Sequence, residues 1–152
     1  YLAAYTFMNV GAWAMVIALR RNGLAGESVD DFNGLVHRSG GATVATLIFL
    51  LSLGGIPPTI GFLGKWYIFG AAIDAGYGWL AVVGAINAAI SIFYYLRIVV
   101  VMVIEDSVED ATLVRSAPLT LTLAVAVVMT IVVGIWAQPF LLWASSASHL
   151  LP

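Results

Sequence analysis

The 152-residue sequence contains no cysteine, and only 9% of its residues are charged. The absence of cysteine excludes disulfides, cysteine-ligated iron–sulfur clusters and thiol catalysis within this chain. Its two histidines, His37 and His149, lie far apart without a neighbouring ligand cluster, so we expect no metal site. The net charge of −2 leaves no large basic face for nucleic acid, and no Gly-rich phosphate loop is present.

Apolar residues take the place of the missing charges. They make up 62% of the sequence, and the mean hydropathy is +1.02. A soluble domain normally carries about 25% charged residues, so a water-soluble fold of this composition would lack the polar groups to cover its surface. The sequence therefore predicts an all-α transmembrane fold. The apolar run begins at once at Tyr1, which we interpret as the interior of a longer sequence and not as a signal peptide.

Four apolar stretches have the length that crosses a hydrocarbon core about 30 Å thick. We predict spans at about 1–20, 43–73, 79–104 and 117–137, which together form one transmembrane domain over 1–152.

The connections between these spans differ in charge. Those after the first and third spans hold Arg20, Arg21, Arg38 and Arg115, whereas the turn after the second span and the C-terminal tail hold no Lys or Arg. The positive-inside rule places the basic loops in the cytoplasm and both ends of the chain on the outer side.

The second span is unusual because Gly54-Gly55-Ile56-Pro57-Pro58 interrupts it. Each proline removes a backbone donor and pushes the preceding residue out of the helical region. The prediction is a half-helix at about 43–54, an unwound link at 55–59 and a second half-helix at about 60–73. Such discontinuous helices are typical of transporters. A proline kink that serves packing alone explains the same residues.

Lys65 lies about five residues into the second half-helix, among apolar and aromatic neighbours. An ionisable residue within the membrane is costly and is therefore a functional-site hypothesis. Desolvation favours the neutral amine, so a buried lysine releases its proton easily, whereas an arginine would stay protonated. This makes Lys65 a candidate proton carrier. The alternative is that its side chain snorkels to the outer interface.

Other polar residues on the apolar helices are weaker candidates. Arg97 lies about two turns from the end of the third span, as an interfacial anchor or as a fixed charge that steers protons or pairs with a carboxylate. Four more either form interhelical hydrogen bonds or hold water in a proton path: Thr6, Asn9, Asn87 and Ser91.

One run carries a family resemblance. Ser52-Leu-Gly-Gly-Ile-Pro-Pro-Thr-Ile-Gly-Phe-Leu-Gly-Lys-Trp-Tyr67 resembles the broken-helix signature of the antiporter-like subunits of respiratory complex I. The runs Tyr5–Trp13, Asp31–Leu35 and Tyr94–Arg97 are similar to the subunit N family. The resemblance covers almost the whole chain, and it implies a C-terminal fragment, helices 11 to 14 of a 14-helix subunit.

The resemblance implies a function. Lys65 matches the family lysine on the broken helix, and the subunit would translocate protons in a bacterial inner membrane as part of an NADH-quinone oxidoreductase that couples quinone reduction to pumping. The chain itself would hold no redox centre, since NAD, FMN, iron–sulfur clusters and quinone belong to partner subunits. Its partners would be other membrane-arm subunits and the lipid bilayer.

Two other functions are compatible with the same residues. One is a subunit of a multisubunit sodium/proton antiporter or of a membrane-bound hydrogenase, in which the lysine and the broken helix would serve in the same way. The other is a structural membrane module without an ion path of its own.

Overall fold

The computed structural model describes residues 2–21, 24–25, 28–107, 111–114 and 116–148. Helices dominate this part of the chain. The longer ones are α1 (Leu2–Ala18), α3 (Gly40–Gly54), α4 (Ile60–Asp74), α5 (Gly78–Ile104), α6 (Ala117–Ile135) and α7 (Gln138–Ser148). Two short elements, the 3₁₀-helix η1 (Val29–Phe32) and helix α2 (Leu35–Arg38), lie in the connection between α1 and α3.

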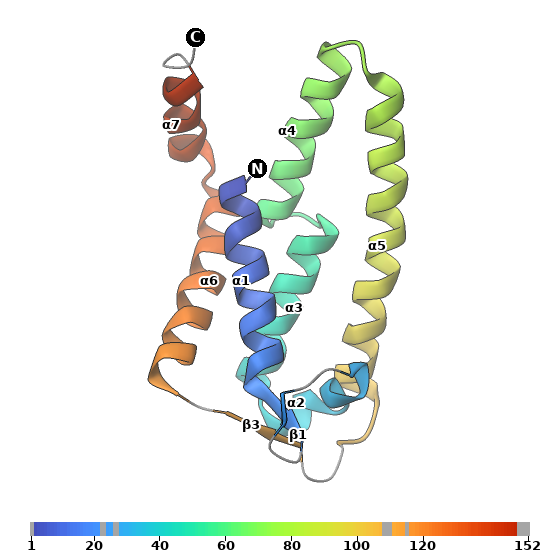
Figure 1. Cartoon of the computed structure of the whole chain (residues 1–152), viewed down its shortest axis with the longest axis vertical. Coiled ribbons are helices and arrows are strands. Elements are labelled where there is room, and N and C mark those ends of the chain that lie inside the picture. The colour runs from blue at the N-terminus through green and yellow to red at the C-terminus, as the bar shows by residue number, and fades with distance from the viewer. Residues whose placement is uncertain (1, 22–23, 26–27, 108–110, 115, 149–152) are drawn as a thin grey trace.

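The helices form one bundle with an extended arm (Figure 1). Helices α1, α3 and α6 pack side by side, and α4 leaves the end of α3 and continues away from the short strands. Helix α5 returns beside α4 and α3, so that it contacts both. The start of α1 and helix α7 lie on the side away from the strands. The junction between α3 and α4 is therefore surrounded by α1, α5 and α6.

Three short strands form a small sheet at one end of the bundle: β1 (Leu19–Arg21), β2 (Leu24–Ala25) and β3 (Ala111–Leu113). Their order is β2-β1-β3, and both pairings are antiparallel. The predicted all-helical class holds, and these short strands lie only in the connections, where the first helix ends at Ala18 as the chain enters β1. Strands of two or three residues are too short to give the alternating pattern by which a strand is recognised in sequence.

The loop after β2 begins with a capped turn. The side chain of Ser28 accepts a hydrogen bond from the Asp30 N–H, and the Asp31 carboxylate accepts one from the Ser28 N–H at 3.0 Å, which is the capping-box arrangement. Asp31 is buried, so this carboxylate serves the turn and does not face the solvent. Burial lowers the pKa of Arg38, and the charge of Asp31 opposes this shift.

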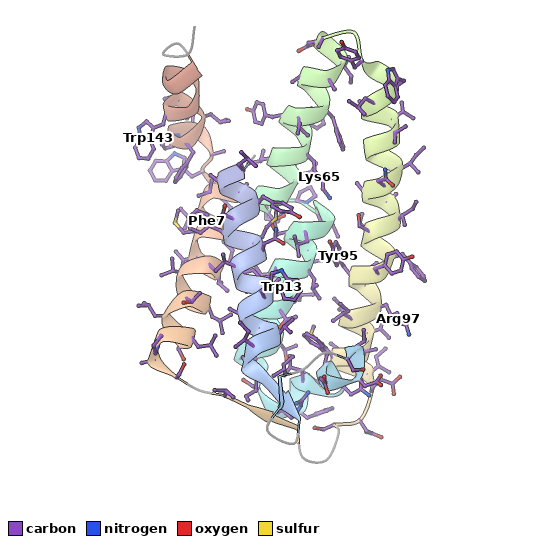
Figure 2. All side chains as sticks on the ribbon, in the orientation of Figure 1. Phe7, Trp13, Lys65, Tyr95, Arg97 and Trp143 are labelled. Carbon is purple, nitrogen blue, oxygen red and sulfur yellow. The ribbon has the colours of Figure 1, made fainter. Side chains whose placement is uncertain are left out.

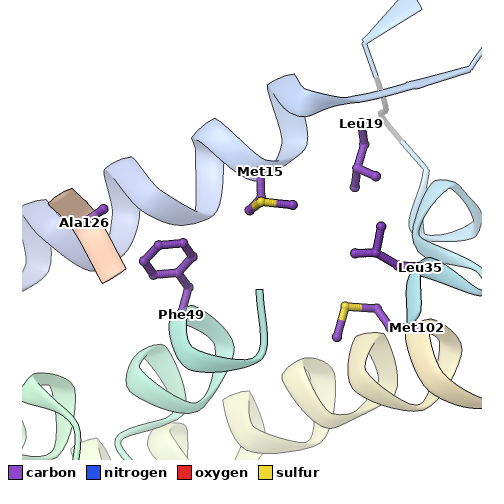
Figure 3. Packing of buried hydrophobic residues seen from close by; sticks show 6 residues of the cluster. All are labelled: Met15, Leu19, Leu35, Phe49, Met102 and Ala126. Carbon is purple, nitrogen blue, oxygen red and sulfur yellow. The ribbon is translucent and has the colours of Figure 1, made fainter. Parts of the chain in front are cut away.

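The main hydrophobic core lies near the strands, between α1, α3, α5 and α6 (Figure 3). Its fully or nearly fully buried members are Met15, Leu19, Leu35, Phe49, Met102 and Ala126. Gly11 lets α1 approach this core closely, because a Cβ at that position would lie 2.2 Å from the ring of Phe49. Small residues at such contacts are characteristic of helix packing in membranes.

Two of the described helices, α5 and α6, are long and apolar enough to cross a membrane, and α1 and α3 are shorter apolar helices. Much of the outward face of α5 consists of large apolar side chains, among them Trp79, Val82, Ile86, Ile90, Phe93 and Ile104. Exposed apolar surface of this extent indicates contact with lipid or with other protein. Helix α7 was not predicted, because the sequence after Gln138 lacks a long apolar run.

Candidate functional site at the α3–α4 junction

The end of α3 is a glycine-terminated turn. Gly55 is its C-cap and has a φ of 80°, a left-handed conformation that glycine adopts without a steric penalty. The Gly55 N–H donates to the Ser52 carbonyl at 3.0 Å, and the Ile56 N–H donates to the Leu51 carbonyl at 2.9 Å. This pair of bonds is the Schellman motif. The turn therefore satisfies two of the last four carbonyls of the helix.

Pro57 and Pro58 follow this turn, and both are exposed and joined by a cis peptide bond. Thr59 is the N-cap of α4, but its side chain makes no capping bond, and its hydroxyl donates instead to the Ile56 carbonyl at 2.7 Å. The first turn of α4 is capped from elsewhere, because the Gly61 N–H donates to the hydroxyl of Ser52 at 3.2 Å. The two helix ends are thus linked directly.

Lys65 reaches back from α4 to the end of α3 (Figure 2). Its Nζ donates to the carbonyl oxygens of Leu53 at 2.8 Å and Gly54 at 2.9 Å. These are the two terminal carbonyls that the turn leaves free, so the lysine completes the capping of α3. A positive charge is also favourable at this end of a helix, where the macrodipole is negative. Lys65 is the only lysine in the sequence.

The stem of Lys65 passes directly over Gly55. A Cβ on Gly55 would lie 2.8 Å from Cδ of the lysine and 3.1 Å from Nζ. The glycine is therefore needed twice, once for its left-handed backbone and once for the space that the lysine occupies. This close contact explains how Nζ reaches carbonyls at the very end of the preceding helix.

Within this chain Lys65 is half-buried. Its Nζ points toward the α3–α4 junction, and not along α4 toward the α4–α5 turn as a snorkelling side chain would. Its bonding partners are main-chain carbonyls, which accept hydrogen bonds from an ammonium group and from a neutral amine alike. The expectation of an amine fully withdrawn from water stays a prediction.

The other candidate residues lie away from this site. Arg97 is exposed on the outer side of α5, as Figure 2 shows, and Asn87 is also exposed. The side chains of Thr6 and Asn9 each donate at 2.9 Å to the carbonyl four residues earlier in α1. Ser91 donates to carbonyls of its own helix at 2.7 and 3.0 Å. These bonds lie within single helices and do not link Thr6, Asn9 or Ser91 to Lys65.

Sequence reasoning missed two contributors to the site. Ser52 was recognised only as the start of a motif, although its hydroxyl is fully buried and bonded to α4. The carbonyls of Leu53 and Gly54 were not foreseen as partners of Lys65. A serine in the last turn of an apolar helix, directly before Gly-Gly, was the available signal for the first. The role of the two carbonyls leaves no signal in the sequence, because every residue carries a carbonyl.

The chemistry of the junction lies in one amine and the carbonyls that surround it. In the part of the chain that the structure describes, no group of three or more His, Asp or Glu side chains comes together as a metal site. The lysine amine is the one titratable side-chain group in the described segment 51–65, which forms the junction. The group at this site that could exchange a proton is therefore Nζ, which two carbonyls hold in place.

An apolar helical bundle in which α5 and α6 are each long enough to cross a membrane fits the class of multi-pass membrane proteins. Residues 1–91 match the family model described as "NADH:quinone oxidoreductase/Mrp antiporter, TM". The chain belongs to this family.

Individual relatives agree with the family match. The chain is 47% identical over 148 residues to NADH-quinone oxidoreductase subunit N 2 of Solibacter usitatus (strain Ellin6076), covering 97% of this chain and 30% of that protein. It is 38% identical over 152 residues to NADH-quinone oxidoreductase subunit N of Trichlorobacter lovleyi, covering 99% of this chain and 31% of the relative. The chain thus spans about a third of the length of the curated relatives it matches.

A solved structure shows the same fold. It is a chain of respiratory complex I from Thermus thermophilus with bound aureothin, and the TM-score is 0.79 at 24% sequence identity. The match covers 91% of this chain and 31% of that chain.

Proposed function

We propose that the chain is a membrane-arm portion of subunit N of a proton-translocating NADH-quinone oxidoreductase, embedded in a bacterial inner membrane. The similarity to subunit N proteins over almost the whole chain supports this proposal. The partners would be other membrane-arm subunits of the complex and the surrounding lipid.

We further propose that the chain crosses the membrane four times, with α3 and α4 forming one interrupted span. Each of these two helices has 15 residues and is about 22 Å long, which is short of a hydrocarbon core of about 30 Å. Together they exceed that thickness. Arg20 and Arg21 lie in β1, and Arg38 is the last residue of α2, so this end of the bundle would face the cytoplasm.

In this proposal Lys65 is the proton carrier. An ammonium group has three N–H donors, and two of them are bonded to the carbonyls of Leu53 and Gly54. The third N–H carries the proton that Lys65 can transfer to a neighbouring group. A neutral amine retains two N–H donors, so it can keep both carbonyl bonds after the proton has left. The position of Nζ at these two carbonyls is the structural observation that carries the proposal.

The chain would contribute proton transfer and no electron transfer. Iron–sulfur clusters are held mainly by cysteine thiolates, and the sequence has no cysteine. We assign NAD, FMN, the iron–sulfur clusters and quinone to partner subunits. Redox energy released there would reach Lys65 as a change in nearby charge or hydration, because a like charge arriving close to an ammonium favours loss of its proton.

The test is Lys65→Ala in the full-length subunit, assembled in its complex in membrane vesicles. NADH-driven proton uptake, followed by quenching of a pH-sensitive dye, should fall to a small fraction of the wild-type rate. Ile68→Ala, an exposed position on the same helix, is the control and should pump normally. Unchanged pumping by the Lys65→Ala complex would contradict the proposal and would favour a purely structural module.

The description of the matched family also includes Mrp antiporters, so a subunit of a sodium/proton antiporter is a second candidate. In that case vesicles would take up or release protons when a sodium gradient is imposed in the absence of NADH. Proton movement that requires NADH and is indifferent to sodium would exclude this candidate.

A further inference from the structure

Ser52 joins three helices through one hydroxyl group. Its side chain is fully buried on α3, and its Oγ accepts a hydrogen bond from the Gly61 N–H of α4 at 3.2 Å. The same hydroxyl donates to the Sδ of Met8 on α1 at 3.4 Å. Neither bond lies within its own helix, in contrast to the other buried hydroxyls of α3, those of Thr43 and Thr46, which donate to carbonyls four residues earlier.

The bond to Gly61 replaces a missing cap. The first N–H groups of a helix have no partner within the helix and normally bond to the side chain of the N-cap residue. The N-cap of α4 is Thr59, whose side chain does not perform this role. Ser52 supplies the acceptor from the preceding helix, so the start of α4 is defined by a residue of α3.

Ser52 and Gly61 are also in direct backbone contact. A Cβ on Gly61 would lie 1.7 Å from the carbonyl oxygen of Ser52, so no residue larger than glycine fits there. Gly61 and Lys65 are four residues apart and lie on the same face of α4, one turn from each other. The first meets Ser52, and the second meets the carbonyls of the next two residues of α3. Two successive turns of α4 therefore each contact the last turn of α3, and these contacts fix how the two helices are aligned.

We propose that Ser52 is a positioning residue for the amine of Lys65. Its hydroxyl fixes the register of α4 against the end of α3 and so keeps Nζ at the carbonyls of Leu53 and Gly54. Without the hydroxyl, the Gly61 N–H is left buried without an acceptor, the first turn of α4 shifts or frays, and the lysine one turn further on loses its defined position. The inference rests on the proposed function of Lys65 as the proton carrier.

The experiment is a double-mutant cycle in the complete complex, with NADH-driven proton uptake and the NADH:quinone reductase rate both expressed per assembled complex. Ser52→Ala should lower both rates by about threefold to tenfold, the range expected for loss of one hydrogen bond. In the Lys65→Ala background, Ser52→Ala should lower the residual quinone reductase rate no further, because the group it positions is already absent. A structural role alone would reduce the rates or the amount of complex in both backgrounds.

Two further variants complete the test. Thr46→Val removes an equally buried hydroxyl from α3, one bonded only to its own helix, and should leave pumping close to that of the wild type. Ser52→Thr keeps the hydroxyl and should pump faster per assembled complex than Ser52→Ala.

The outcomes separate this inference from the function on which it rests. Wild-type pumping by Ser52→Ala, an additive loss in the double variant, or equal pumping by Ser52→Ala and Ser52→Thr would each overturn the role of Ser52. In all three cases the loss of pumping in Lys65→Ala alone would still support the proton carrier. Normal pumping by Lys65→Ala would remove the proposed function and this inference together.

Discussion

Gly134 of α6 lies against the carbonyl group of Pro58, so closely that a Cβ on Gly134 would be 2.5 Å from the Pro58 oxygen. The same Cβ would be 2.6 Å from the backbone nitrogen of Ile60, where α4 begins. Both atoms belong to the main chain, and neither can move aside by a side-chain rotation. The α3–α4 junction is thus held by α6 on one side and by the Ser52–Gly61 contact on the other.

Gly134→Ala is therefore expected to force α6 away from the junction. Overpacking of a close contact costs about 1–3 kcal/mol, so the purified complex should unfold at a lower temperature. Thermal unfolding followed by intrinsic fluorescence measures the change. The control is Gly41→Ala, since a Cβ at Gly41 would meet nothing within 4 Å, and this variant should unfold as the wild type does. Equal unfolding temperatures for the two variants would contradict the contact.

Gly55→Ala should damage the site in two ways. The left-handed backbone of Gly55 costs about 1 kcal/mol or more for any residue with a Cβ, and the added methyl would displace the stem of Lys65. We expect lower pumping per assembled complex, measured by dye quenching in vesicles. Gly70→Ala, within α4 and with nothing within 4 Å of its Cβ position, is the matched control and should pump normally. Normal pumping by Gly55→Ala would show that the position of the stem is unimportant.

Lys65→Arg tests whether residue 65 must lose its proton. The guanidinium keeps a positive charge and several N–H donors near the carbonyls of Leu53 and Gly54, but it is not deprotonated in proteins. The complex should therefore assemble, with pumping reduced as severely as in Lys65→Ala. The measurement compares proton uptake with the amount of complex in the same membranes. Full activity of the arginine variant would mean that a fixed charge is sufficient.

Arg97 gives a different prediction, because it is exposed on the outer side of α5. If it anchors α5 at the interface, Arg97→Lys should keep both assembly and pumping, since a lysine side chain also reaches the headgroups. Pumping in vesicles and the yield of intact complex provide the measurement. A severe loss in Arg97→Lys would indicate instead a paired carboxylate that requires the two-pronged geometry of arginine.

Local sequence chemistry accounts for where α3 ends and where α4 begins. The glycine and prolines between Gly54 and Ile60 determine where the backbone can turn, because each acts on its own residue or its neighbour. Lys65 was singled out for a similar reason, since a charge in an apolar run is conspicuous in any sequence. That α3 and α4 together form a single interrupted span stays a prediction.

The partners of these residues were not predictable, because they arise only after the chain has folded back on itself. Lys65 bonds to carbonyls, which are the same for every residue, and Ser52 bonds to an N–H nine positions away across the turn. Leu19 of β1 and its partner Leu113 of β3 are 94 positions apart in the sequence, and both strands are too short to show a pattern. Each of these contacts depends on tertiary structure and not on local preference.

The ladder between β1 and β3 has a mechanical consequence. Strand β1 follows α1 directly, β3 precedes α6, and the pairing extends to a bond from the Val114 N–H to the Ala18 carbonyl at 2.8 Å. A slip of one residue between α1 and α6 would break every bond of this ladder. The ladder therefore ties the end of α1 to the chain that leads into α6. An axial displacement of one of these helices would either carry the other with it or break the ladder.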